Sequence, residues 1–238
     1  MTRKSVEETL ARQGYAFVPA IEMRDLLDAD ALAQWEGFAE SWNHLGLDRY
    51  MADGGRYRRR RHAVFAVGRD GIDRKPHQPH YQSRDYNALN GGVERWFTPV
   101  DDAIATHPVL LSILRACHDL FDGLTTPGQR PESWHVELHQ FRIEPSSQED
   151  GKPTPEGLHR DGVDWVLVLL VSRVNIESGI TTIHDLRGQE LGSFTLIEPL
   201  DAALVDDGRV YHGVTAVHPT DPASESHRDV LVVTFRRP

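Results

Sequence analysis

The second half of the chain alternates short apolar runs with turn-forming residues, and this pattern constrains the fold more than any other feature. Turn signals such as Arg187-Gly188 and Asp206-Asp207-Gly208 separate the runs. The candidate strands are residues 56–67, 133–143, 164–174, 179–185, 193–198, 201–206, 209–217 and 227–236. Many short strands without intervening helices are typical of an antiparallel sandwich or barrel. We therefore expect a mainly β core.

The first half of the chain has apolar residues at helical spacing instead. Residues 5–13 and 29–45 are predicted helices, and a third helix is expected after Pro108. Cys117 lies in the apolar stripe of this third helix. We interpret it as a buried core residue, because a nucleophile would need an activating base nearby.

The length and composition of the chain allow one large domain. It has 238 residues, of which 39% are hydrophobic, which is enough for a substantial core. We expect a single domain over residues 1–238. Its helical flank would cover about residues 1–50 and its strand-rich core about residues 56–238.

The charge and the cysteine content limit the compartments and the classes of partner that we expect for this chain. The formal net charge of −10 argues against nucleic acid or an anionic membrane as a partner. A single cysteine excludes an internal disulfide, the N-terminal segment lacks a secretory signal, and the longest apolar run (165–171) is too short to cross a bilayer. We expect a cytoplasmic protein that acts on a small molecule. A homodimer is compatible with these features.

One basic segment could suggest a different partner. Residues 56–62 read Arg-Tyr-Arg-Arg-Arg-Arg-His, and such a run is typical of a nucleic-acid patch when taken alone. However, the whole chain is acidic, and the arginines alternate between both faces of a predicted strand. We interpret most of them as a solvated strand face.

The segment His159-Arg160-Asp161-Gly162 is the strongest candidate for chemistry. Residues i and i+2 of an extended segment point to the same side, so His159 and Asp161 can offer a nitrogen and an oxygen to one metal ion. A second histidine would complete a 2-His-1-carboxylate face, which leaves positions open on iron(II). His212, in the predicted strand 209–217, is the candidate for that ligand.

Two other groups of residues show comparable patterns. The segment His227-Arg228-Asp229 repeats the His-x-Asp spacing, but no histidine follows it. His135, Glu137 and His139 alternate on one face of a predicted strand and could bind a metal by themselves. Spacing alone leaves these alternatives open.

Long segments around these residues resemble a known family. They are MADGGRYRRRRH (51–62), ELHQFRI (137–143), TPEGLHRDGVDWVLVLLVSR (154–173), ITTIHDL (180–186), FTLIEPLDAALVDDGRVYHGVT (194–215) and RDVLVVTF (228–235). In this order they are similar to the iron(II)/2-oxoglutarate-dependent dioxygenases that include bacterial L-isoleucine dioxygenases. The resemblance covers most of residues 35–238. It implies a double-stranded β-helix core, the cupin-like jelly roll, with flanking α-helices.

The resemblance also implies a site and a reaction. It makes His159, Asp161 and His212 the iron(II) ligands, and Arg228 the partner of the 2-oxoglutarate C5 carboxylate, a role that suits a planar guanidinium. With O₂, the implied reaction hydroxylates or sulfoxidises a small substrate, most simply a free aliphatic L-amino acid, and releases succinate and CO₂. Two alternatives are a cupin-like metalloenzyme that uses the set on strand 133–143 without 2-oxoglutarate, and a non-catalytic small-molecule-binding regulatory protein.

Five further residues are weaker candidates for contact with the substrate. They are Tyr57, Arg58, Gln140, Arg142 and Trp165. The first two belong to the basic segment, where a cation or a phenol could bind a substrate carboxylate. The next two share a strand face, and Trp165 follows Asp161 by four residues, so it can project to the same side.

The loop 145–156 precedes His159 and is almost entirely polar. It has little apolar area with which to pack, so we expect it to be mobile. Its position beside the predicted metal ligands suggests a lid that orders when the substrates bind.

Overall fold

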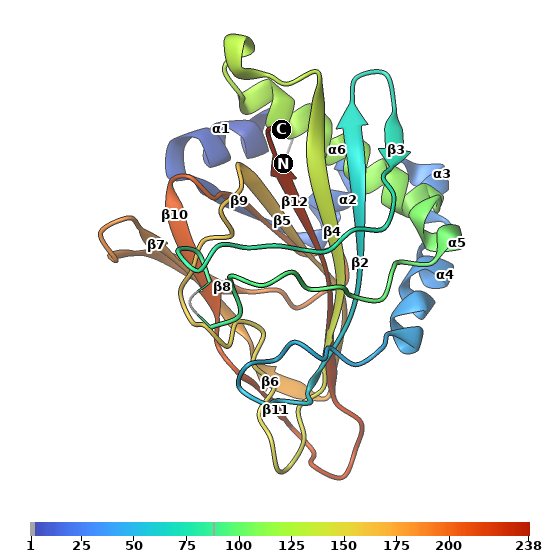
Figure 1. Ribbon diagram of the computed structural model, residues 1–238, viewed down its shortest axis with the longest axis vertical. Coiled ribbons are helices and arrows are strands. Elements are labelled where there is room, and N and C mark those ends of the chain that lie inside the picture. The colour runs from blue at the N-terminus through green and yellow to red at the C-terminus, as the bar shows by residue number, and fades with distance from the viewer. Residues whose placement is uncertain (1–2, 88) are drawn as a thin grey trace.

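A large antiparallel sheet forms the centre of the protein. The computed structural model describes residues 3–87 and 89–238, and the strand order in this sheet is β1-β9-β5-β12-β4-β2-β3 (Figure 1). The strands are β1 (Tyr15–Val18), β2 (Arg58–Gly68), β3 (Ile72–Arg74), β4 (Ser133–Ile143), β5 (Trp165–Val174), β9 (Ala202–Asp206) and β12 (His227–Arg236). Apart from the hairpin of β2 and β3, neighbours in this order are distant in sequence, as expected for a jelly roll.

Two small sheets form a second layer. One has the order β10-β7-β8 and the other pairs β11 with β6. Their strands are β6 (Ile176–Ser178), β7 (Ile180–Asp185), β8 (Glu190–Thr195), β10 (Val210–Val214) and β11 (Val217–Pro219). Val166 and Val205 of the large sheet pack against Ile183 and Val210 of the second layer. The predicted jelly-roll core of antiparallel strands is therefore confirmed.

Helices cover the outer face of the large sheet (Figure 1). They are α1 (Arg3–Gln13), α2 (Ala20–Leu26), α3 (Ala29–Leu32), α4 (Trp35–Glu40), α5 (Asp102–Ala105) and α6 (Pro108–Leu124), with the 3₁₀ turns η1 (Ser41–His44) and η2 (Pro127–Gln129). Phe121 of α6 stacks on Trp165 of β5, with ring centroids 5.3 Å apart. Cys117 lies buried in the same core. None of the described helices is long and apolar enough to cross a bilayer.

Three predicted elements differ from the structure. The helix predicted over 29–45 is divided into α3, α4 and η1, because the hydrogen-bond ladder tightens at Gln34, whose N–H donates to the carbonyl of Ala31. Strand 193–198 instead spans Glu190–Thr195, directly after a turn in which Asp185 accepts two backbone N–H groups. Strand 209–217 is divided into β10 and β11.

The segment between β3 and α5 contains neither a helix nor a strand in its described part, and it crosses the open side of the two layers (Figure 1). Backbone hydrogen bonds between His80 and Arg95, at 3.0 and 2.9 Å, hold its two arms together. Gln82 and Asn87 between them are buried. This crossing segment closes one side of the space between the layers.

Candidate active site

A cavity of about 300 Å³ lies between the two layers and beneath the crossing segment. Valines of β5, β10 and β12 form much of its wall, and its polar groups come from β2, β4, β10, β12, the crossing segment and the segment before β5. This combination of apolar walls and a few convergent polar groups is typical of a small-molecule site.

The three predicted metal ligands meet at this cavity. The metal-binding atoms of His159, Asp161 and His212 all lie within 4.8 Å of one another. The Asp161 carboxylate is between the imidazoles, at 3.7 Å from Nε2 of His159 and 3.5 Å from Nε2 of His212. The backbones of His159 and His212 exchange two hydrogen bonds of 3.0 Å, which brings β10 beside the segment that precedes β5.

Further hydrogen bonds and charges fix the state of the His159 and Asp161 side chains. Nδ1 of His159 lies 3.0 Å from the carbonyl of Gly157, which can only accept, so Nδ1 carries a proton and Nε2, on the side of Asp161, is the nitrogen that can bind a metal ion. Burial alone would raise the pKa of Asp161, but the two imidazoles lower it well below its ordinary value. The site therefore presents a carboxylate and imidazole nitrogen to a cation.

Asp207 holds the turn that carries Asp161. Its carboxylate accepts the backbone N–H groups of Asp161 and Gly162 at 2.8 Å each, and that of Val163 at 3.1 Å. Gly162 has a φ of +79°, and a Cβ there would lie 2.6 Å from the Tyr86 ring. Sequence reasoning assigned Asp207 only to a turn, because nothing local links it to a segment so distant in the chain.

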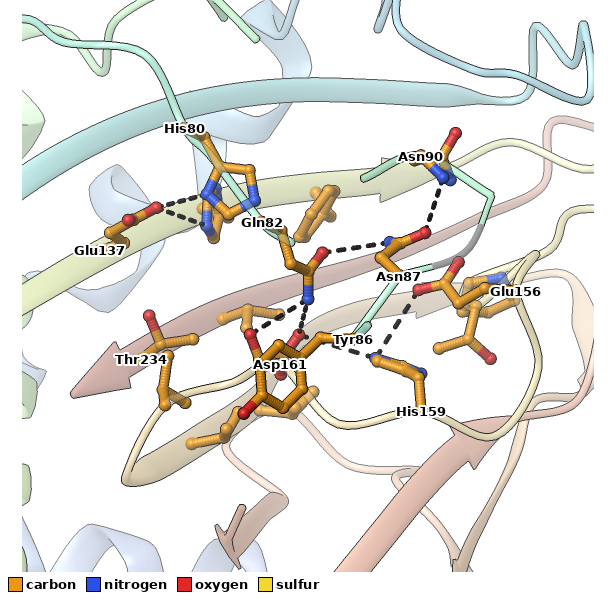
Figure 2. Close-up of a pocket in the computed structure, with 18 of the residues that line it drawn as sticks. His80, Gln82, Tyr86, Asn87, Asn90, Glu137, Glu156, His159, Asp161 and Thr234 are labelled. Atoms are coloured by element: carbon orange, nitrogen blue, oxygen red, sulfur yellow. Dashed lines mark hydrogen bonds and ion pairs between the residues drawn. The ribbon is translucent and has the colours of Figure 1, made fainter. Parts of the chain in front are cut away.

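The crossing segment also supports Asp161 and was not anticipated. The amide of Gln82 donates to the Asp161 carbonyl at 3.2 Å, and Asn87 donates to Gln82 at 3.1 Å (Figure 2). Asn87 in turn accepts the backbone N–H of Asn90. These amides have no periodic pattern in the sequence that could have identified them.

Arg228, the second residue of β12, lines the cavity together with Val230, Val232 and Thr234, as strand alternation predicted. Its side chain is only 1% exposed, and neither Nε nor Nη2 has a hydrogen-bond partner among the described residues. Burial and the nearby Arg173 lower the pKa of Arg228 to about 10. A buried guanidinium in this state is expected to receive an anion.

The competing set on β4 forms a hydrogen-bonded network. Glu137 is its centre, and its carboxylate contacts His80 (Figure 2). The same carboxylate lies 3.1 Å from Nε2 of His62. The described atoms that could share a metal there belong to His62, His80, Glu137 and His139, and His135 is not among them. Nδ1 of His135 contacts Lys75, and its Nε2 lies 3.5 Å from Oε1 of Glu137.

The tautomer of His139 disfavours a metal ion in this network. Nη2 of Arg60 lies 2.9 Å from Nδ1 of His139, and because a guanidinium only donates, Nδ1 must accept. The neutral ring then carries its proton on Nε2, which faces Glu137 at 3.8 Å. A fixed cation beside the network also opposes a divalent metal ion.

The other His-x-Asp segment has a different environment. Asp229 receives a bidentate pair of hydrogen bonds from Arg142, at 2.8 and 2.7 Å. His227 lies 3.6 Å from the same carboxylate, and the pair belongs to neither group of potential metal ligands in the described residues.

Of the five weaker substrate candidates, Arg58 alone lines the cavity. Tyr57 is buried and donates to Asp53, and Gln140 donates to Ser41 at 2.9 Å. The remaining two have partners described above, namely Asp229 for Arg142 and Phe121 for Trp165.

The basic strand face is not mainly solvated. Arg58 and Arg60 are each 5% exposed and point into the cavity, where Asp48 forms ion pairs with both. Arg59 and its equivalent on the outer face, Arg61, pair with Glu144 and Asp101. The expectation of a solvated face was therefore wrong for the inner arginines, because it ignored the cavity on that side of β2.

The polar loop 145–156 is attached at two points. Gly151 exchanges two backbone hydrogen bonds with Val217, and the hydroxyl of Thr154 bonds to the backbone of Val214. Residues 146–150 are exposed, whereas Pro153, Thr154 and Glu156 line the cavity. The loop thus borders the site, as its position in the sequence predicted.

Comparison with known proteins points to one family. The sequence profile of the 2OG-Fe dioxygenases matches residues 39–234. L-isoleucine-4-hydroxylase of Bacillus thuringiensis is 29% identical over 157 residues, which is 66% of this chain and 64% of that protein. The chain thus matches slightly less than two thirds of that relative. The 3(1)-hydroxy-L-isoleucine 4-dioxygenase of Pantoea ananatis is 24% identical over 235 residues, or 96% of this chain and 94% of that protein.

Solved structures show the same architecture. A bsmA homolog from Methylobium petroleophilum PM1 superposes with a TM-score of 0.88 and 36% identity, over 100% of this chain and 94% of that one. IDO from Bacillus thuringiensis superposes with a TM-score of 0.82 and 18% identity over the full length of both chains.

Proposed function

Because this chain belongs to the 2OG-Fe dioxygenase family, we propose that it hydroxylates a free aliphatic L-amino acid, with iron(II) as cofactor and with 2-oxoglutarate and O₂ as co-substrates. The family match supports the reaction class. The names of the two curated relatives, both of which refer to isoleucine or a hydroxyisoleucine, support the choice of substrate. A thioether side chain would be sulfoxidised by the same chemistry.

We assign the iron(II) to His159, Asp161 and His212. The single observation that carries this assignment is the tautomer of His159, since its Nδ1 donates to a backbone carbonyl and leaves Nε2 free for a metal. The competing network lacks this property at His139. When bound, iron and 2-oxoglutarate supply the oxidising chemistry and yield succinate and CO₂.

Arg228 is the proposed partner of the 2-oxoglutarate C5 carboxylate. Its guanidinium is buried, faces the cavity and has two nitrogens without hydrogen-bond partners among the described residues. A carboxylate can accept two parallel hydrogen bonds from such a group. Arg173 cannot neutralise it, because it carries the same charge.

The apolar wall is suited to an aliphatic side chain. Val166 and Val168 of β5 and Val232 of β12 line the cavity, while Gln82 and Tyr86 of the crossing segment cover the side where Asp161 lies. The valines can pack against methyl groups, and the cover limits the access of water. Both effects direct the reaction toward an unactivated C–H group of the substrate.

The proposal is tested by incubating the protein aerobically with iron(II), 2-oxoglutarate and a panel of amino acids. We expect a product heavier by one oxygen atom, formed together with succinate, and no product when 2-oxoglutarate is left out. Turnover that is independent of 2-oxoglutarate would favour the cupin-like alternative instead. Binding of small molecules without any turnover would favour the regulatory protein.

A further inference from the structure

Two side chains of opposite charge line the cavity, and each has buried polar atoms that lack a hydrogen-bond partner among the described residues. Arg95 of the crossing segment is 3% exposed, and its Nε and Nη2 have no hydrogen-bond partner in the described part of the chain. Oε2 of Glu156, which also lines the cavity, is buried and likewise lacks a partner there. The other oxygen of Glu156 lies 3.7 Å from Nε2 of His159 (Figure 2).

The neighbours of Arg95 do not provide an anion for it. Asp48 is 2.8 Å from Nη2 of Arg58 and 3.8 Å from Nη1 of Arg60, so this carboxylate already serves two arginines. Glu137 is engaged by the imidazoles around it. Arg95 is therefore a surplus cation on its side of the cavity.

Arg95 and Glu156 are close enough to interact but are not in contact. Burial and Arg58 lower the pKa of Arg95, and Glu156 is one of the carboxylates that oppose this effect. No ion pair within 4.0 Å joins these two described side chains. A buried charge without a partner costs free energy. A buried cation and a buried anion that line the same cavity therefore favour a ligand that carries one negative and one positive group.

We propose that Arg95 binds the α-carboxylate and Glu156 the α-ammonium group of the substrate. This inference rests on the proposed function and makes it more specific: the substrate is a free, zwitterionic α-amino acid, and neither a simple amine nor an amino acid within a peptide is accepted. Because Glu156 contacts His159, the ammonium group lies beside the metal ligands, and the substrate side chain extends along the apolar wall. Arg228 remains available for the second carboxylate-bearing molecule.

Binding of the amino acid can be measured by calorimetry, with Zn²⁺ replacing iron(II) and with 2-oxoglutarate present, so that no turnover occurs. Arg95→Gln and Glu156→Gln should each weaken binding of the amino acid about 100-fold, as expected when one partner of a buried charge pair is removed. At saturating Zn²⁺ the affinity for 2-oxoglutarate should stay unchanged in both variants, which also shows that the variants are folded. Arg84→Gln and Glu94→Gln alter exposed residues of the same segment and should change nothing.

Substrate analogues test the pairing in the wild-type protein without any mutation. The primary amide lacks the carboxylate charge, and the deaminated acid lacks the ammonium group, so each should bind about 100-fold more weakly than the amino acid. Arg95→Gln should bind the amide and the amino acid equally, and Glu156→Gln should do the same for the deaminated acid and the amino acid. This crossed pattern assigns each charge to one residue.

The outcomes separate this inference from the proposed function. If both variants bind an amino acid as well as the wild type does, Arg95 and Glu156 do not bind its charged groups, and the proposed function stands. If Arg95→Gln weakens 2-oxoglutarate instead, Arg95 belongs to the co-substrate site and the inference is overturned. If no amino acid binds to the wild type, both the proposed substrate class and the roles of Arg95 and Glu156 are wrong.

Discussion

The unpaired guanidinium of Arg228 leads to a prediction about stability as well as about binding. Its pKa is lowered from the ordinary arginine value to about 10 by burial and by Arg173. This shift corresponds to a cost of ~3 kcal/mol for keeping the cation in the folded state at neutral pH. Because the folded pKa is the lower one, the cost is present below pH 10 and disappears as the pH rises above it.

Replacement of Arg228 by methionine should remove this cost and keep most of the apolar contacts of the side chain. We expect Arg228→Met to be more stable than the wild type by up to ~3 kcal/mol without ligands. When Zn²⁺ and 2-oxoglutarate are bound, the wild type should become the more stable protein, because its Arg228 then donates charge-assisted hydrogen bonds to the 2-oxoglutarate carboxylate. The affinity for 2-oxoglutarate should fall by about 2–5 kcal/mol in the variant.

Urea unfolding near neutral pH, with and without Zn²⁺ and 2-oxoglutarate, measures both effects. Arg142→Met is a matched control, since Arg142 pairs with Asp229 outside the cavity. The control should be less stable than the wild type and should bind 2-oxoglutarate normally. An Arg228→Met protein that is destabilised without ligand, or that still binds 2-oxoglutarate tightly, would refute the reasoning.

Three other predictions concern the metal, the cysteine and the loop. Asp161→Ala should abolish iron(II) binding and turnover, while His139→Ala should preserve the iron stoichiometry in metal analysis. The reverse result would move the iron to the β4 network. Burial raises the pKa of the Cys117 thiol, so iodoacetamide should label it only after unfolding, and rapid labelling of the native protein would contradict its place in the core. Glu-C protease should cleave after the exposed Glu149 faster without ligands than in the anaerobic complex with 2-oxoglutarate and amino acid. Equal rates would mean that loop 145–156 is only a connector.

The strands and the local geometry of the site were accessible from the sequence. The two-residue period of an extended chain predicts that His159 and Asp161 share a side, and the same alternation predicts that Arg228 faces the cavity with Val230 and Val232. Helical spacing likewise indicated the burial of Cys117. These properties depend on backbone geometry over a few residues, so a single segment contains the necessary information.

Pairings between distant segments were decided by the tertiary structure. The inward direction of Arg60 and the contact of Gln82 with Asp161 depend on where a cavity opens and on how the crossing segment closes it. The same holds for the placement of Arg95 and Glu156 around one cavity. The sequence alone determined which face each strand residue occupies. Only the packing of the two layers determined which faces meet, because that choice depends on burial summed over the whole chain.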